Sequence, residues 1–570
     1  MSDPVKTAET LQTLLRDEWE WRLREFPTYA TYVGDRRYDD RLEEMSLDAI
    51  ERRKGERRAL LDRALAIDPA ALAEDDRLNY DLILGELRLE IDGHRFPSEL
   101  LAVNQMSGVH QELAELALFA PRGRAEDFHN FVGRIRDYPR LVGETIELLR
   151  AGISKGIVQP KVPLGQVPEA IGAQIAEEPE QSPVWQAMFA EMPESIGQAE
   201  REEIRSAARS ALRDVAPSLR RLLEFWNDEY YPRTRESIAL AELPDGRAWY
   251  AYKVREMTTT ELTPDEIHEI GLAEVTRIER EMEAIREEVG FEGDLEQFFD
   301  HLRSDPRFFF REKSDLLVAY RDIAKRLDPE LPRLFRTLPR LPYGVAAVPE
   351  YSEKSQPTAY YMPGSPEAGR PGIFYANTYD LTARPRWEME ALTAHEAVPG
   401  HHLQIALAQE MEDVPEFRKW ASYTAFIEGW GLYSESLGSE LGLYRDPYSR
   451  FGCLTYEMWR AIRLVVDTGI HSKGWSREQA IDFFRTHAGK ADHDISVEVD
   501  RYIVWPGQAL AYKIGQLKIR ELRVRAEAEL GAAFDIRAFH DIALLAGPVP
   551  LSYLEKRVGE WVAREVGALG

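Results

Sequence analysis

Hydrophobic residues recur at helical spacing along most of the chain, and this pattern predicts a mainly α-helical protein. The segment from residue 7 to residue 26 carries large apolar residues on one face: Leu11, Leu14, Leu15, Trp19 and Leu23. A second such stretch begins at Ser46 and places Leu60, Leu61 and Leu65 on one side. We therefore expect long amphipathic helices from the N-terminus onward.

Two segments carry the signature of a helix N-terminus. Thr263 can cap a helix, Pro264 fits the first turn, and Glu266 completes a capping box. A second signature of this kind begins at Ser476 and is followed by a run with several apolar residues. Both positions are predicted to begin helices.

One segment departs from the helical pattern. Residues 341–380 are rich in proline, glycine and tyrosine, and two runs within them, 358–362 and 372–378, are typical of strands joined by a Pro/Gly loop. We expect a small β-sheet or hairpin here. The proline-bearing stretch 332–349 is the best candidate for a boundary, which divides the chain into an N-terminal helical region, 1–340, and a C-terminal region, 341–570.

Composition narrows the class of protein. With 570 residues, 44% of them hydrophobic and 30% charged, the chain is globular and long enough for two or three units or one large two-lobed enzyme. Its 72 basic and 99 acidic side chains leave a net charge of −27, which repels phosphate backbones and anionic lipid. We therefore expect no nucleic-acid partner.

The sequence also argues against a membrane or disulfide-stabilised protein. No apolar run is long enough to span a bilayer, and the first residues lack an apolar signal core, so we expect no membrane partner and a cytoplasmic location. The one cysteine, Cys453, permits neither an intrachain disulfide nor a cysteine-based zinc knuckle. Its neighbours indicate a small buried hydrophobe rather than a nucleophile.

The candidate chemistry lies in a cluster of histidines. Residues 394–404 read AHEAVPGHHLQ and follow a helix-like run. A His-Glu pair with a later histidine is the core of the zinc-hydrolase signature, in which two imidazoles bind the metal and the glutamate, here Glu396, takes a proton from the bound water. The alternative is a group of ordinary surface or helix-end histidines.

The spacing of these histidines is unusual. His401 is six residues after His395, so an undistorted helix would turn it away, whereas His402 returns to the same face about two turns, ~10 Å, further on. Pro399 cannot donate to the carbonyl of His395 and crowds that turn, and Gly400 permits an unusual backbone. We predict a kink or bulge that makes His401 the second ligand, with His402 as the alternative.

A third ligand is offered about thirty residues later. Glu428 lies in an apolar, glycine-bearing helix, where a carboxylate is costly to bury without a partner. Two histidines and one glutamate leave a fourth metal position open for water, which is the catalytic arrangement. Glu435 shares the helix face and either orients a ligand histidine or is an exposed helix charge.

Further polar residues lie among apolar ones in the late helices. Asp467 and His471 are four residues apart, so that Asp467 can orient His471 and His471 can donate to a developing oxyanion. Arg501 can receive a substrate carboxylate as a bidentate fork, and Tyr502 or Tyr512 can be a second oxyanion donor. The alternative for each of these residues is a role in the fold.

These residues belong to sequence blocks that resemble a bacterial family first catalogued as domain of unknown function 885 and described as zinc peptidases. The blocks run in order over nearly the whole chain, at 26–35, 395–402, 428–435, 466–471 and 506–513. The resemblance implies a mostly α-helical, two-lobed peptidase with a deep channel, similar to thimet oligopeptidase and the thermophilic zinc carboxypeptidases. Those relatives use His-Glu-x-x-His, whereas this chain has two further residues before its second histidine.

Together these patterns predict a zinc-dependent metallopeptidase that hydrolyses short peptides. His395, His401 and Glu428 would hold one Zn²⁺, with Mn²⁺ or Co²⁺ as possible substitutes, and Glu396 would act as general base. The strand 372–378 would form the cleft edge, where Asn377 could hydrogen-bond an added substrate strand. Two alternatives stay open: a metal-dependent amidohydrolase for a non-peptide amide, and a non-catalytic helical binding protein.

Overall fold

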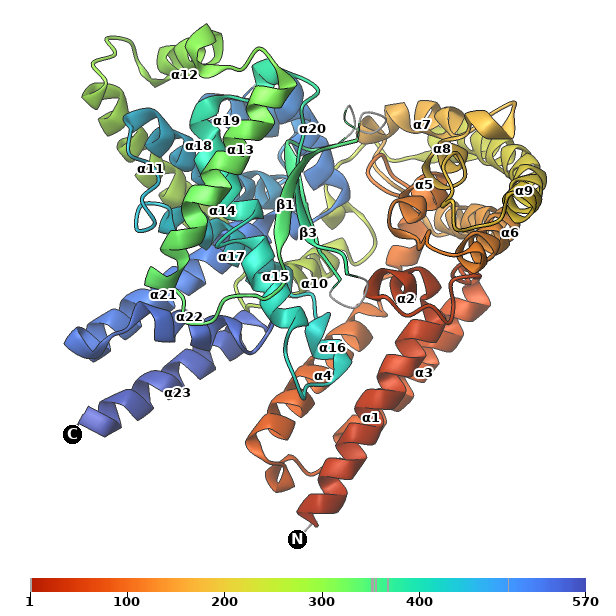
Figure 1. The fold of residues 1–570 in the computed structure, drawn as a ribbon, viewed down its shortest axis with the longest axis horizontal. Helices are drawn as coiled ribbons and strands as arrows, with labels where there is room; N and C mark the ends of the chain where they lie inside the picture. Colours follow the sequence, from red (N-terminus) through yellow and green to blue (C-terminus); the bar gives the residue numbers. More distant parts are fainter. Residues whose placement is uncertain (1–2, 350–352, 354–355, 366–368, 491, 570) are drawn as a thin grey trace. The chain divides into compact units, whose positions relative to one another are not determined.

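A computed structural model describes residues 3–349, 353, 356–365, 369–490 and 492–569. As predicted, the protein is mainly α-helical, and the described residues include a small sheet near residues 341–380 (Figure 1). The chain divides into two compact units, Met1–Gly246 and Arg247–Gly570. Among the described residues, no helix is both long and apolar enough to cross a membrane.

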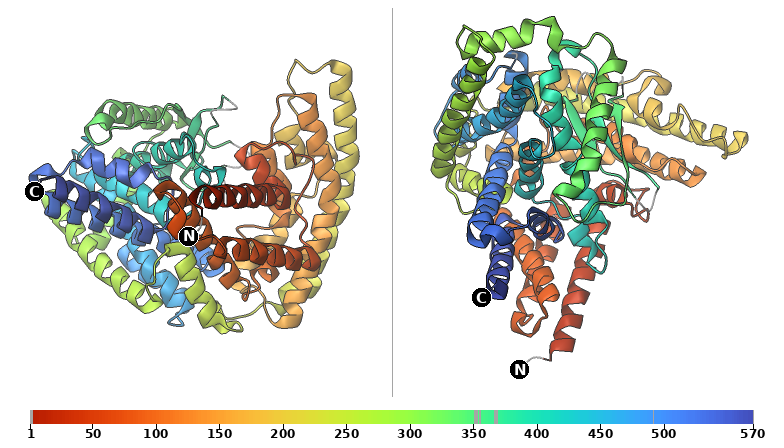
Figure 2. Two further views of the ribbon diagram at one scale, coloured as in Figure 1. Left: turned by 90° about the horizontal axis from the view of Figure 1, so that it is seen from below. Right: turned by 60° about the vertical axis from the view of Figure 1, so that its left-hand side comes forward.

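The first unit is built from helices. Their bounds are α1 Pro4–Glu25, α2 Pro27–Val33, α3 Leu47–Leu65, α4 Glu74–Gly93, α5 Val109–Phe119, α6 Ala125–Lys155, α7 Val167–Ala173, α8 Pro183–Met188 and α9 Gln198–Phe225. The two predicted N-terminal helices are confirmed as α1 and α3, and the Ser46 side chain caps α3 by accepting from the Ala49 N–H. Helices α6 and α9 lie side by side (Figure 2) and share an aromatic-rich core with α5 and α8.

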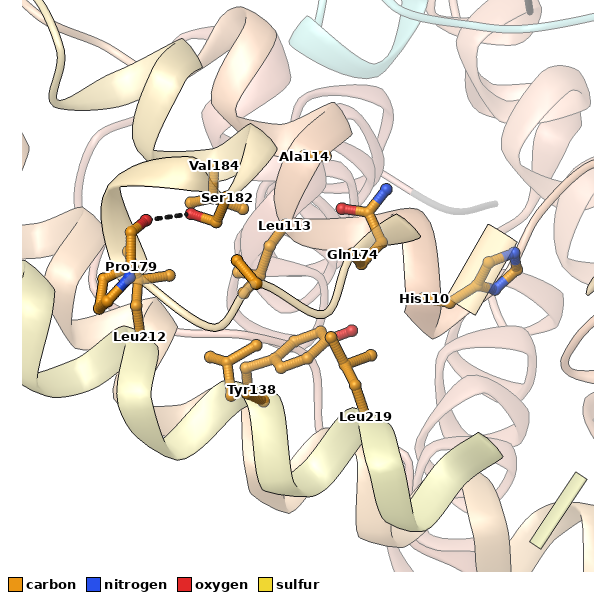
Figure 3. A pocket seen from close by; sticks show the side chains of 13 residues that line it. His110, Leu113, Ala114, Tyr138, Gln174, Pro179, Ser182, Val184, Leu212 and Leu219 are labelled. Atoms are coloured by element: carbon orange, nitrogen blue, oxygen red, sulfur yellow. Dashed lines mark hydrogen bonds between the residues drawn. The ribbon is translucent and has the colours of Figure 1, made fainter. Parts of the chain in front are cut away.

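A small cavity lies inside this core (Figure 3). His110 lines it together with Leu113, Tyr138, Leu212 and Leu219. The His110 side chain is buried, and neither ring nitrogen has a hydrogen-bond partner within the described chain. Burial therefore lowers the pKa of His110 to about 4.

Replacing His110 with leucine should make the protein less sensitive to acid. The free ring takes up its proton near pH 6.5 but the buried ring only at about pH 4, so the unfolded chain binds the proton first and stability falls as the pH drops between these values. At pH 5 this effect is worth roughly 2 kcal/mol. Urea unfolding at pH 7 and pH 5 measures it. Equal losses in both proteins would show that His110 does not carry the effect.

The second unit holds the sheet and the remaining helices. The strands are β1 Tyr343–Ala347, β2 Ala359–Met362 and β3 Gly372–Ala376. The helices are α10 Gly246–Thr258, α11 Pro264–Glu288, α12 Leu295–Ser304, α13 Lys313–Leu327, α14 Met389–Glu396, α15 His401–Gln409, α16 Glu416–Lys419, α17 Thr424–Leu437, α18 Pro447–His471, α19 Arg477–His487, α20 Asp492–Val504, α21 Ala511–Leu530, α22 Ile536–Leu544 and α23 Leu551–Leu569. Both predicted helix starts are confirmed as capping boxes, at α11 and α19.

The boundary suggested near residue 340 falls inside this second unit. Helix α11 packs along α18, and Gly271 lets the two axes approach, because a methyl group there would lie 2.7 Å from Cγ2 of Val465. Helix α13 packs against α14. Residues 247–340 therefore fold with the part of the chain that carries the histidine cluster.

The sheet has the order β1-β3-β2. Strands β2 and β3 pair antiparallel, which confirms the two predicted strands, while β1 adds in parallel on the other side of β3. Strand β1 escapes the sequence pattern because Tyr-Gly-Val-Ala-Ala does not alternate apolar and polar residues. Strand β3 is thus central and paired on both sides, so the prediction that it forms a cleft edge open to a substrate strand is wrong.

Candidate metal centre

The two candidate histidines flank a break between helices. Helix α14 ends at Glu396 and α15 begins at His401, and the intervening turn contains a cis peptide bond between Val398 and Pro399. A methyl group at Gly400 would collide with the carbonyl oxygen of His395, so this turn requires glycine. In place of one bulged helix there are two helices. His401 consequently lies beside His395, with ring centroids 4.7 Å apart.

Glu428 joins the two histidines from α17. Its Oε2 lies 3.6 Å from Nε2 of His395 and 3.5 Å from Nε2 of His401. The candidate ligand atoms of all three residues lie within 4.8 Å of one another. Two imidazole nitrogens and one carboxylate oxygen are a donor set that Zn²⁺ takes in catalytic sites, with a fourth position left for water. These residues fit such an ion.

Glu435 fixes the orientation of the first histidine. Nδ1 of His395 donates to Oε1 of Glu435 over 2.8 Å, which leaves Nε2 facing Glu428. Gly431 makes room for this ring, because a methyl group there would lie 2.8 Å from its Cε1. The sequence left two interpretations of Glu435, a carboxylate that orients a histidine and an exposed helix charge. Because Glu435 is buried and contacts His395, the structure favours the first.

Small residues hold helix α17 close to helix α21. A methyl group on Gly429 would lie 2.5 Å from Cα of Gly515, so the two backbones touch where these glycines meet. Glu428 precedes this contact directly in the sequence. The close packing therefore fixes the backbone that presents the third candidate ligand.

Carboxylates around His395 favour positive charge at this place. Burial opposes protonation of the ring, but Glu428, Glu435 and Glu396 outweigh burial and raise the pKa of His395 to about 10. Burial also opposes ionisation of Glu428, yet hydrogen bonds with His395 and His401 hold its pKa well below the usual range. The same negative potential would stabilise a bound metal cation.

The alternative ligand, His402, is tied to the sheet. Its Nδ1 forms a 2.9 Å hydrogen bond with the hydroxyl of Tyr361, and its ring lies 4.6 Å from the ring of Tyr343. Burial lowers the pKa of His402 to about 4. The structure thus brings His401, and not His402, to the cluster with His395.

Comparison with known proteins agrees with the sequence blocks. The model of a bacterial protein family of unknown function, DUF885, matches residues 27–558. The chain belongs to this family. It is similar to the crystal structure of a "putative lipoprotein" from Colwellia psychrerythraea, with 28% identity, a TM-score of 0.92, and coverage of 98% of this chain and 99% of that one.

A second solved structure shares the fold of this DUF885 member. It is a "putative lipoprotein of unknown function" from Shewanella oneidensis, with 18% identity, a TM-score of 0.72, and coverage of 96% of this chain and 99% of that one. No curated protein matches the chain. The cytoplasmic location expected from the sequence stays a prediction.

His471 and Asp467 serve the fold of this DUF885 protein. His471 is fully buried, and its Nε2 donates to the carbonyl oxygen of Tyr502 over 2.9 Å. Asp467 accepts from the Tyr250 hydroxyl at 2.6 Å and from the Gly507 N–H at 3.1 Å, and burial raises its pKa to about 7. The expectation that His471 donates to an oxyanion is not supported, because the main chain already takes its Nε2 proton.

The other candidate residues in the C-terminal helices, Arg501, Tyr502 and Tyr512, differ in burial and in hydrogen-bond partners. Arg501 donates to Oε1 of Gln508 at 2.5 Å and to Glu498 at 3.3 Å. The Tyr502 hydroxyl is buried, accepts from Nε of Arg463 at 3.0 Å and donates to Glu498 at 2.7 Å, so its proton is taken up within the fold. Tyr512 is partly exposed.

The polar atoms of Asn377 also have hydrogen-bond partners within the fold. Its Nδ2 donates to the carbonyl oxygens of Glu353, Gln356 and Pro357, at 2.7 to 3.1 Å. Its Oδ1 accepts from the N–H of Tyr379. Both polar atoms of the side chain thus have partners within the fold, and the structure does not support the prediction that Asn377 binds substrate.

Two residues near the centre escaped the sequence analysis. Arg460 and Arg463 lie on α18 among apolar residues, and Arg460 comes within 3.6 Å of Oε1 of Glu435. The available signal was a pair of arginines three apart on a helix whose other residues at 461–466 are all apolar. A buried arginine requires a partner, and that partner is visible only in three dimensions.

Proposed function

We propose that this protein is a zinc-dependent metallopeptidase that hydrolyses short peptides. The observation that carries the proposal is the convergence of Nε2 of His395, Nε2 of His401 and Oε2 of Glu428, with Glu396 next to the first ligand. The bound metal would lower the pKa of a coordinated water and polarise the scissile carbonyl. Mn²⁺ or Co²⁺ could occupy the same donor set.

The remaining chemistry falls to residues of the chain. Glu435 accepts the Nδ1 proton of His395, so Nε2 is the nitrogen that would bind the metal after losing its proton. Glu396 ends α14 and lies in the same buried environment. In the proposed reaction its carboxylate takes one proton from the attacking water and delivers it to the amine as the C–N bond breaks. The other proton of the water stays on the new carboxyl group, so the products are a carboxylic acid and an amine, which at neutral pH become a carboxylate and an ammonium group.

Metal analysis and peptide cleavage test this proposal together. The purified protein should contain one equivalent of zinc and should cleave members of a short-peptide library, as detected by mass spectrometry. A chelator should abolish cleavage and added zinc should restore it. Cleavage of non-peptide amides alone would favour the amidohydrolase, and protein that neither holds nor takes up zinc would favour a binding protein.

Exchanging Glu435 for glutamine should weaken metal binding without unfolding the protein. The amide still fills the space but no longer offers a charged acceptor to Nδ1 of His395, and such outer partners commonly contribute 10- to 100-fold in metal affinity, roughly the loss expected here. Chelator competition measures the zinc Kd. The control is Glu440→Gln, which removes a carboxylate paired with Arg523 instead. Equal Kd values for both variants would mean that packing alone orients the ring.

A further inference from the structure

Three arginines gather beside the candidate metal centre with few carboxylates to balance them. Arg460 and Arg463 lie three residues apart on α18, and both are more than nine-tenths buried. Arg463 and Arg501 share one carboxylate, Glu498, at 3.1 Å and 3.3 Å. The carboxylate nearest to Arg460 is Glu435, whose Oε1 lies 3.6 Å away and already accepts from the histidine of the metal centre, while its Oε2 has no hydrogen-bond partner in the described part of the chain.

Donor groups of these arginines are left without acceptors. Nε of Arg460 and one terminal nitrogen of Arg463 are buried and have no hydrogen-bond partner in the described part of the chain. Unmatched donors on buried charged groups are unfavourable, which indicates a missing acceptor. The chain as a whole carries a net charge of −27, so this local excess of positive charge is not a general property of the protein.

Tyr512 covers the arginines on one side. Its ring lies 4.5 Å from the guanidinium carbon of Arg463 and 6.0 Å from that of Arg460. Unlike these two arginines, Tyr512 is partly exposed. Tyr512 and Arg501 are thus the members of this group that solvent reaches.

The arginines are linked to the metal centre by two short steps. Arg460 is 3.6 Å from Glu435, and Glu435 is 2.8 Å from Nδ1 of His395. An anion held by this group would thus lie close to the site where we place hydrolysis. Such an anion would be a charged group of the substrate that the metal ligands themselves do not contact.

We propose that Arg460, Arg463, Arg501 and Tyr512 form a subsite for the free C-terminal carboxylate of a peptide substrate. This inference rests on the proposed function and names its substrate class. Guanidinium groups match a planar carboxylate through paired N–H donors, and a tyrosine hydroxyl adds a further donor. A subsite beside the metal would direct cleavage to bonds near the C-terminus.

Matched peptides that differ only at the C-terminus test the subsite. The wild-type protein should cleave the free acid with a kcat/KM about 10- to 100-fold above that of the C-terminal amide, a range typical of losing a charged hydrogen bond. Arg463→Lys and Tyr512→Phe should reduce this preference mainly through a higher KM for the acid. The phenylalanine variant retains the ring, so it tests the subsite even if the lysine variant folds poorly.

Arg477→Gln is the matched control, because Arg477 pairs with Asp500 and lies outside the proposed subsite. It should keep the full preference for the free acid. Equal cleavage of acid and amide by the wild-type protein would overturn the subsite while leaving the peptidase proposal intact. A second peptide carries a C-terminal amide and a glutamate as its penultimate residue. If this peptide is cleaved as well as the free acid, the subsite binds acidic side chains and the C-terminal assignment is overturned.

A binding measurement separates failure of the subsite from failure of the proposed function. By calorimetry, N-acetylphenylalanine should bind the metal-loaded protein and N-acetylphenylalaninamide should not, whether or not any peptide is cleaved. Tyr512→Phe should weaken binding of the acid. Equal binding of acid and amide would overturn the subsite, and so would inorganic phosphate that competes as strongly as the acid, because that result would indicate a general anion site.

Discussion

The variant Glu396→Gln is expected to keep its zinc and to lose at least ~10²-fold in kcat, the usual contribution of a general base. Glutamine has nearly the same shape as glutamate, so the end of α14 and the adjacent ligand His395 should stay in place. It cannot take a proton from the attacking water, and the chemical step should therefore slow while KM changes little. Metal analysis and steady-state kinetics on one cleaved peptide measure both quantities.

Glu416→Gln is a suitable control for this variant. Glu416 lies at the surface in α16 and pairs with Lys419, so its replacement should leave kcat unchanged. Near-normal turnover by the Glu396 variant would refute the mechanism, whatever its metal content. Loss of zinc from the same variant would instead place Glu396 among the ligands.

The second large effect is expected at the metal ligands. His395→Ala and Glu428→Ala should each reduce bound zinc from one equivalent to almost none and abolish hydrolysis, because two remaining protein ligands hold a catalytic zinc poorly. Elemental analysis after dialysis gives the stoichiometry directly. A His395→Ala protein with one full equivalent of zinc would show that the metal lies elsewhere.

His401 and His402 offer an internal comparison of neighbouring histidines. His401→Ala should lose zinc, since its Nε2 lies 3.5 Å from Oε2 of Glu428. His402→Ala should retain zinc and lose stability instead, because its hydrogen bond with Tyr361 and its contact with Tyr343 disappear. The opposite result would reassign the second ligand.

Much of the helical framework is determined by short stretches of sequence. The box formed by Thr263 and Glu266 and the one begun by Ser476 each start a helix where predicted, because a cap satisfies backbone donors within a few residues and needs no distant partner. The strands β2 and β3 are likewise specified locally by their β-forming residues and the Pro/Gly loop between them. Such signals survive in any tertiary context that leaves the segment intact.

The composition of the candidate centre could also be predicted from the sequence. His395 and Glu396 stand out through the His-Glu signature, and Glu428 stands out because a carboxylate in an apolar helix requires a partner, which a metal ion could supply. Residue type and spacing thus identified which residues belong together. They did not determine how those residues meet.

Tertiary contacts decided the rest. The choice of His401 over His402 depends on the turn at Gly400, which closes against the backbone of His395. In the sequence, Asn377 and His471 are candidates for contact with a substrate. In the structure, their N–H groups donate to carbonyl oxygens of other segments. Segments far apart in the sequence supply these partners, as α18 does for α11 and β1 does for β3. A local pattern reports which groups need a partner, whereas only the folded chain determines which partner each one finds.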